Sequence, residues 1–185
     1  MKFEKQNRQA LPLNKDDKEF HRVQYSLKMA LRMINGTFEE LDVYQYGNTS
    51  GVLDDELDKT MVESWYKPQD NHEEKKIANE LNLPFREEYQ DVTTGSIVKN
   101  PAEIKLNETI VFYVFKVLVG KAFVMKKSAI ANSFSQNPRA ALHPDYDSIY
   151  IQDDSNEGAA DYVSHTYRVF TKESVRLLYK VKAKI

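Results

Sequence analysis

The stretch 109–125, TIVFYVFKVLVGKAFVM, constrains the fold of this chain most, because it is apolar almost without interruption. From residue 110 to residue 119 only Lys116 is neither aliphatic nor aromatic. This composition favours a strand covered on both faces, since a half-exposed strand alternates apolar and polar residues. A buried helix is the competing interpretation, but Val and Ile are stiff in helices and Gly120 ends the run. The stretch therefore predicts the central strand of a sheet, a turn at Gly120, and a short second strand over 122–125.

Apolar periodicity predicts helices in the first half of the chain. Residues three and four positions apart form an apolar stripe over 16–34, and Met29 and Met33 are expected to broaden its buried face. Apolar residues four apart predict a second helix over 53–65. Asn71, followed three residues later by an acid, resembles a capping box and predicts a short third helix.

The second half of the chain predicts mostly strands. In the last of them apolar residues alternate with basic ones, apart from Leu178, so one face of that strand is expected to meet water. Helices that come first and strands that come last favour an α+β fold with a mostly antiparallel sheet. The predicted short strands are 43–46, 146–151, 164–170 and 175–182. The segment 85–100 is expected to be irregular, and 126–144 is expected to be a long loop with room for a brief helical turn.

Cysteine usage and the first residues indicate where the protein works. The chain contains no cysteine, which excludes disulfides, thiolate zinc sites and cysteine nucleophiles and is typical of a reducing compartment. The first residues, MKFEKQNRQALPLNKDD, contain no apolar run like that of a signal peptide. The stretch 109–125 is too short, and its flanks too charged, to cross a membrane. We therefore expect an intracellular protein, cytoplasmic or nuclear, that is not secreted and has no membrane contact.

Charge is unevenly distributed along the chain, although the net charge is only −2. Residues 39–92 carry fifteen acidic and five basic side chains, whereas residues 1–38 carry eight basic and four acidic ones. An acidic middle third repels phosphate backbones, so nucleic acid is not an expected partner. Solvated surface charge is the simplest explanation, and docking onto oppositely charged proteins is the alternative.

Familiar catalytic and metal-binding patterns are missing from the sequence. The four histidines are scattered, and no second histidine follows His72 at the spacing of a zinc site. The glycines do not repeat at the spacing of a phosphate-binding loop, and no Gly-x-Ser-x-Gly segment is present. We therefore predict no metal site and no nucleophile of these types.

Several segments, taken in order, resemble the later half of a poly(ADP-ribose) polymerase (PARP) catalytic domain. In that family a strand ending in V-x-x-G precedes an H/Y-D-S element, a strand of the type E-Y-x-V-Y, and a final strand with a Q-V-x-x-x-Y-L pattern. The order and the spacing fit this chain. The matching segments are 117–121 (VLVGK), 145–149 (DYDSI), 166–170 (TYRVF) and 175–179 (VRLLY).

Two earlier segments extend the resemblance. RMIN at 32–35 resembles the R-I-x-N that ends a family helix, and YQYGNT at 44–49 lies where the nicotinamide-binding L-F-H-G-T strand belongs. The resemblance implies an ADP-ribosyltransferase-like pair of packed, mostly antiparallel sheets around a cleft. It also implies NAD as the cofactor of active members.

The residues that carry the family's chemistry are replaced in this chain. Tyr46 stands where the family has a His that holds the adenosine ribose. Thr166 stands where the family has a Glu, and it has no charge to stabilise an oxocarbenium-like transition state. The Y-G-x-G-I-Y-F-A segment that supplies a stacking Tyr has no counterpart in residues 85–109. Gly47 is retained and is the expected remnant of the nicotinamide site.

We therefore expect an extended N-terminal arm, 1–14, and a single ADP-ribosyltransferase-like domain, 15–185. The resemblance implies a domain without catalytic residues or cofactor, which binds other proteins as a structural part of a larger complex. The alternative is an active mono-ADP-ribosyltransferase that uses NAD and whose site residues lie elsewhere. Independently of the resemblance, the aperiodic arm and long loops are also typical of a small α+β component of an assembly.

Overall fold

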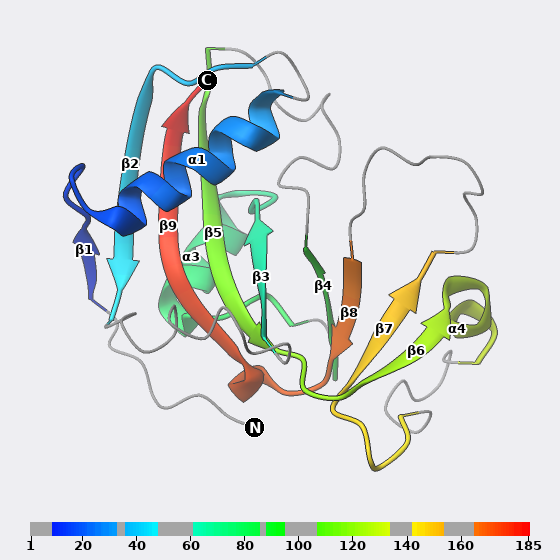
Figure 1. Cartoon of the computed structure of the whole chain (residues 1–185). Helices are drawn as coiled ribbons and strands as arrows, with labels where there is room; N and C mark the ends of the chain where they lie inside the picture. Colours follow the sequence, from blue (N-terminus) through cyan, green and yellow to red (C-terminus); the bar gives the residue numbers. More distant parts are fainter. Residues whose placement is uncertain are drawn as a thin grey trace.

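The computed structural model describes residues 9–32, 36–47, 61–85, 88–94, 107–133, 142–153 and 165–185. They form an α+β fold with two sheets, which confirms the predicted fold class (Figure 1). Strand pairs are antiparallel, with β6 and β7 as the one parallel exception in the described residues. The five-stranded sheet has the order β1 (Ala10–Pro12), β2 (Glu40–Tyr46), β9 (Val175–Lys184), β5 (Thr109–Leu118), β3 (Met61–Tyr66). The four-stranded sheet has the order β4 (Gln90–Thr94), β8 (His165–Val169), β7 (Ser148–Gln152), β6 (Ala122–Lys126).

Two helices cover opposite faces of the five-stranded sheet. Helix α1 (Lys18–Arg32) lies in front of the sheet in Figure 1 and α3 (Asn71–Glu80) lies behind it. A third helix, α4 (Lys127–Ser133), follows β6. The sheets meet where β3 lies beside β4, and there the Ser64 hydroxyl donates a hydrogen bond to the Thr93 carbonyl at 2.9 Å. No helix within the described residues is long and apolar enough to cross a membrane.

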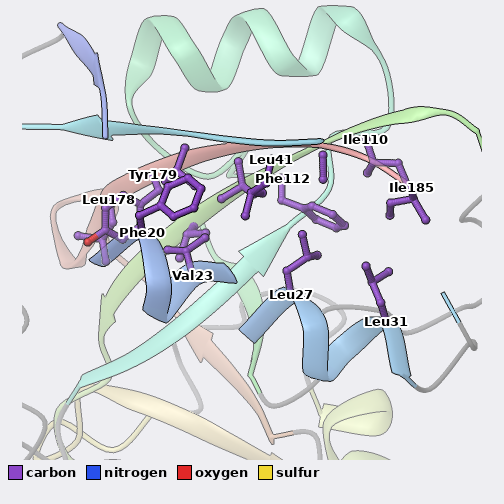
Figure 2. Packing of buried hydrophobic residues seen from close by; sticks show 14 residues of the cluster. Phe20, Val23, Leu27, Leu31, Leu41, Ile110, Phe112, Leu178, Tyr179 and Ile185 are labelled. Carbon is purple, nitrogen blue, oxygen red and sulfur yellow. The ribbon is translucent and has the colours of Figure 1, made fainter. Parts of the chain in front are cut away.

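The core in front of the sheet is built from the predicted stripe of α1. Its apolar side chains point toward β2, β5 and β9 (Figure 2), and each fully buried Leu contributes about 2 kcal/mol to the free energy of unfolding. The helix predicted over 16–34 is confirmed, with the narrower bounds Lys18–Arg32. The role predicted for Met29 is wrong, because its side chain is 41% exposed; Met33 lies outside the described residues. The residues that α1 contributes to this core are Phe20, Val23, Leu27 and Leu31.

A β-bulge at Leu178 explains the one break in the alternation of β9. Tyr179 pairs with Val114 and Leu177 pairs with Phe115, so Leu178 has no partner on β5. The extra residue switches the side chains of β9 from one face to the other. Leu177 therefore packs in the core on the α3 side, and Tyr179 packs in the core on the α1 side.

The apolar stretch 109–125 forms the two predicted strands, β5 and β6, but their places differ from the prediction. β9, not β5, is the middle strand of the five-stranded sheet. β6 belongs to the other sheet, where it pairs in parallel with β7. β5 is nevertheless covered on both faces, since Phe112 and Val114 face the α1 core while Tyr113 and Phe115 face the α3 core.

The predicted helix over 53–65 is wrong where the structure describes it. Residues 61–66 form strand β3, which pairs with β5 in the register Met61↔Leu118. The remainder of that prediction, residues 53–60, lies outside the described residues. The prediction of irregular structure over 85–100 is also wrong in part, because β4 lies within it. Helix α4 confirms the brief helical turn expected within 126–144.

Residues 10–12 of the N-terminal arm are extended, and β2 holds them. Ala10 pairs with Tyr46, and Pro12 pairs with Tyr44. The Leu13 N–H continues the pairing, donating to the Val43 carbonyl at 2.8 Å. This part of the arm therefore belongs to the five-stranded sheet.

Candidate functional site

The Tyr46 side chain lies inside the protein, at the end of β2. It is 5% exposed and belongs to the core between the five-stranded sheet and α3, which also contains Ile77 of α3 and Leu177 of β9. Burial raises the pKa of the Tyr46 hydroxyl, and the nearby carboxylate of Glu74 raises it further, while Lys180 acts in the opposite direction. The position that the resemblance assigns to a ribose-binding His thus holds a core side chain.

Gly47 follows directly and gives the chain a left-handed turn. Its φ is +67°, a conformation that Gly adopts without the steric cost that a Cβ brings. The residue is half-buried. The rest of the predicted turn, 48–51, lies outside the described residues.

Helix α3 places two acids against the sheet, and its N-terminus fixes their positions. The cap is Asp70, one residue before the predicted Asn71, and its carboxylate accepts a hydrogen bond from the Glu73 N–H at 2.8 Å. Glu73 in turn accepts from the N–H of Gln69, the residue before the cap, at 3.2 Å. Glu73 also accepts a hydrogen bond of 2.6 Å from the Tyr66 hydroxyl, so the helix start is tied to β3.

The next acid, Glu74, forms the centre of a half-buried polar cluster beside Tyr46. Lys180 of β9 donates to Glu74 Oε1 at 2.8 Å, and the two side chains are 29% and 27% exposed. The hydroxyl of Tyr113 lies 3.5 Å from the same oxygen, and the Lys180 ammonium lies 5.8 Å from the Tyr113 ring centroid. Burial is the main cause that raises the pKa of the Tyr113 hydroxyl, and the negative charge of Glu74 raises it further. The ion pair between Lys180 and Glu74 helps to hold α3 against the sheet.

Thr166 lies on β8 in the four-stranded sheet, whereas Tyr46 lies in the five-stranded one. Its neighbours across the strands are Thr93 of β4 and Ile151 of β7. The hydroxyl oxygens of Thr93 and Thr166 are 3.3 Å apart, a hydrogen bond between two neutral groups. The side chain at the position where the resemblance expects a Glu is therefore bonded within its own sheet.

Beside Thr166, a buried arginine ties β8 to β4. Arg168 Nε and Nη2 donate to the two carboxylate oxygens of Asp91 at 2.8 and 3.0 Å, and the guanidinium lies 4.1 Å from the centroid of the Tyr89 ring. Burial by itself would lower the pKa of Arg168, but the hydrogen bonds and charge of Asp91 raise it above its ordinary value. The arrangement is a bidentate, structural ion pair.

Sequence reasoning missed Glu74, Lys180 and Tyr113 as members of one site. Glu74 and Lys180 are 106 positions apart in the chain, and only the topology brings them together. A weak signal existed, because the basic residues of the last strand alternate with apolar ones and therefore share one face. A second missed contact joins Tyr150 and His165, whose hydroxyl and Nδ1 are 2.9 Å apart on the four-stranded sheet.

Two motifs of the resemblance contact one another. The Gly120 turn is closed by Asp147, whose carboxylate accepts a hydrogen bond from the Lys121 N–H at 2.9 Å. The next residue, Ser148, donates from its hydroxyl to the Val119 carbonyl at 2.6 Å. The V-x-x-G and D-S elements thus lock the end of β5 to the start of β7, which is a structural role.

A pocket of about 390 Å³ lies elsewhere, between the start of α1 and β2. Phe20, Phe38 and Leu41 supply its apolar lining, and Tyr46 and Thr166 are not part of it. Within the described ranges, no three His, Asp or Glu side chains lie together in a way that could hold a metal ion.

Comparisons with known proteins bear on the fold. No family model and no curated protein matches the sequence. A crystal structure of the TASOR pseudo-PARP domain matches with a TM-score of 0.55, over 94% of this chain and 98% of that chain, at 10% sequence identity. At this identity the similarity shows the fold alone. The chain therefore has a PARP-like fold.

Proposed function

We propose that this chain is a PARP-like domain that lacks ADP-ribosyltransferase activity and acts by binding other proteins, as one component of a larger complex. The burial of Tyr46 carries the proposal. The side chain at the ribose-binding position packs against α3 and the sheet with 5% of its surface exposed. A ligand could reach this position only if the core beneath α3 opened.

Thr166 supports the same proposal from the other sheet. Cleavage of the nicotinamide bond builds positive charge on the ribose, and a carboxylate placed beside it is the usual means of stabilising that charge. Thr166 is neutral, and its hydroxyl lies 3.3 Å from that of Thr93. The similarity to a domain that is itself named a pseudo-PARP agrees with this interpretation.

Nicotinamide release from NAD tests the proposal. We expect the purified chain to release no more nicotinamide than a heat-inactivated sample. The Thr166→Glu variant should stay inactive, because a carboxylate alone does not open the position held by Tyr46. Release well above the control in the unaltered chain would favour the alternative, an active mono-ADP-ribosyltransferase.

Thermal unfolding in the presence of NAD tests binding separately from catalysis. A ligand at about 100 times its Kd raises the free energy of unfolding by about 2.7 kcal/mol, which shifts the Tm visibly. We expect millimolar NAD to leave the Tm unchanged. A clear rise in Tm would show that the chain binds the nucleotide.

A further inference from the structure

Helix α1 presents a stripe of exposed side chains on the side away from the sheet. We call Lys18, His21, Tyr25, Lys28 and Met29 the α1 outer stripe; all five are exposed. Their spacing of three and four residues aligns them along one helix face. Tyr25 is 65% exposed and Met29 is 41% exposed. Two large apolar side chains one turn apart are thus left outside the core that α1 forms.

The outer stripe contains cations but no carboxylate. The acid within α1, Glu19, is turned toward the sheet, where it accepts hydrogen bonds from Arg22 Nε at 3.2 Å and from the Tyr179 hydroxyl at 2.8 Å. Arg22 is also turned inward and pairs with Glu63 of β3 at 2.9 Å. The paired charges of α1 thus lie partly buried on the side of the sheet. Lys18 and Lys28 are exposed, and the Lys28 ammonium lies 5.9 Å from the centroid of the Phe38 ring.

The outer stripe lies outside the core that joins α1 to the sheet. The core between α1 and the sheet is formed by Phe20, Val23, Leu27 and Leu31, which lie on the opposite side of the helix. Tyr and Met are costly to leave in water but are well suited to binding, because Tyr carries much of the energy of interfaces and Met adapts to irregular surfaces. The stripe therefore has the composition of a contact surface.

We propose that the α1 outer stripe binds an acidic amphipathic segment of a partner protein. Tyr25 and Met29 pack against the apolar residues of that segment, and Lys18 and Lys28 pair with its carboxylates. Charge complementarity favours this occupant, since the two lysines of the stripe attract the carboxylates of an acidic segment. The exposed Asp16 and Asp17 lie just before the start of the stripe and not within it. The inference deepens the proposed protein-binding function, on which it rests.

Other anionic partners fit the stripe less well. Recruitment to anionic lipid usually needs clusters of about four to eight basic residues, and α1 exposes two lysines on this face. Nucleic acid binding draws on many phosphate contacts, and residues 39–92 of this chain are strongly acidic. A protein segment that combines apolar and acidic residues can contact both the apolar and the basic side chains of the stripe.

Binding of a defined peptide to the full chain tests the proposal. The probe is a fluorescein-labelled amphipathic peptide of about fourteen residues, enough for a marginal helix, with Leu along one face and Glu beside it. The control peptide carries Gln at every Glu. We expect fluorescence anisotropy to show binding of the Glu peptide, and at least about tenfold weaker binding of the Gln peptide.

Matched variants locate the binding. Lys18→Glu with Lys28→Glu, and separately Tyr25→Ala with Met29→Ala, should each weaken binding at least about tenfold. The control is Lys75→Glu with Lys76→Glu on α3, which makes the same charge change at exposed positions and should alter binding less than about twofold. Chemical-shift mapping on the unaltered protein should place the peptide on α1 and does not depend on any variant folding.

Several results would overturn the proposal. The Gln peptide could bind as tightly as the Glu peptide, or the α3 control variant could lose as much affinity as the α1 variants. The chemical-shift changes could also be centred away from α1. Stronger binding of anionic vesicles or of a duplex oligonucleotide through the same residues would replace the protein partner with another class. Concentration-dependent self-association abolished by the Tyr25 and Met29 changes would make a second copy the occupant. None of these results depends on nicotinamide release, so failure here is distinct from failure of the proposed lack of activity.

Discussion

Asp147 occupies the space that a Cβ atom on Gly120 would need, while its carboxylate holds the Lys121 N–H at 2.9 Å. Gly120 also has a φ of +54°, which costs a residue with a side chain about 1–2 kcal/mol. Gly120→Ala should therefore lower the free energy of unfolding by about 2 kcal/mol or more. In a domain of this size the Tm should fall by about 4–8 °C, as measured by calorimetry.

The Asp147→Ala background removes part of the steric cause of that loss. The contacts of the carboxylate disappear, while the Cβ of residue 147, 2.7 Å from the added Cβ, and the backbone strain remain. Gly120→Ala should therefore cost less than in the unaltered chain. Equal costs in both backgrounds would mean that Asp147 moves aside freely, and the contact would then be incidental.

The ion pair between Lys180 and Glu74 should contribute measurably to stability. Its side chains are about three-quarters buried and 2.8 Å apart, so removing one partner leaves the other poorly solvated. We expect Glu74→Gln and Lys180→Met each to cost about 1–2 kcal/mol, with a coupling of about 1 kcal/mol in a double-mutant cycle from urea unfolding.

The exposed pair Lys172–Glu80 is the matched control for that cycle. Its atoms are 3.8 Å apart and its side chains are 57% and 41% exposed. Surface pairs of this kind couple by a few tenths of a kcal/mol. If both cycles gave the same small coupling, the Lys180–Glu74 contact would not fasten α3 to the sheet.

The buried tyrosine beside Glu74 predicts a loss of stability in base. Burial and the charge of Glu74 raise the pKa of Tyr113 above its ordinary value of 10.0. Above pH 10 the unfolded chain therefore loses a proton that the folded protein keeps, so the stabilisation present below pH 10 is lost as the pH rises further. Tyr113→Phe should move the onset of alkaline unfolding, followed by circular dichroism, to higher pH. An unchanged onset would contradict the burial of the hydroxyl.

Arg168 and Asp91 should not tolerate a charge-conserving exchange. The guanidinium makes two parallel hydrogen bonds, at 2.8 and 3.0 Å, and a lysine cannot reproduce that geometry. Arg168→Lys should cost about 1–2 kcal/mol, measured by urea unfolding. A cost below about 0.5 kcal/mol would contradict the importance of the two parallel hydrogen bonds.

Elements could be predicted from the sequence where their apolar residues recur with a single clear periodicity, that of a helix or that of a strand. Helix α1 has a single buried stripe and was correctly predicted, as were β5 and the last strands. β3 was mistaken for a helix because both of its faces carry apolar side chains: Trp65 packs with the α1 core, and Val62 and Tyr66 pack with the α3 core. The four-residue spacing of Met61 and Trp65 therefore imitates a helix by coincidence. The two-residue alternation of a strand cannot be seen, because neither face of β3 is polar throughout.

Sheet membership and the polar cluster could not be predicted, for a different reason. β6 follows β5 after a short turn, so a hairpin is the local expectation. Its partner is β7, whose Ser148 pairs with Ala122 in parallel. The contact between Glu74 and Lys180 likewise depends on how α3 crosses the sheet, which local periodicity does not encode. The resemblance predicts replacements at Tyr46 and Thr166, but the burial of Tyr46 required the structure.

The place of β9 has a consequence for how the chain folds during synthesis. β9 follows β2, β3 and β5 in the chain, yet it pairs with both β2 and β5 at the middle of their sheet. Until β9 has left the ribosome, the strands on its two sides cannot join, and their unpaired edges are open to wrong partners. A premature stop before residue 175 would therefore leave separated fragments of a sheet, and such a nascent chain would depend on chaperones to stay out of aggregates.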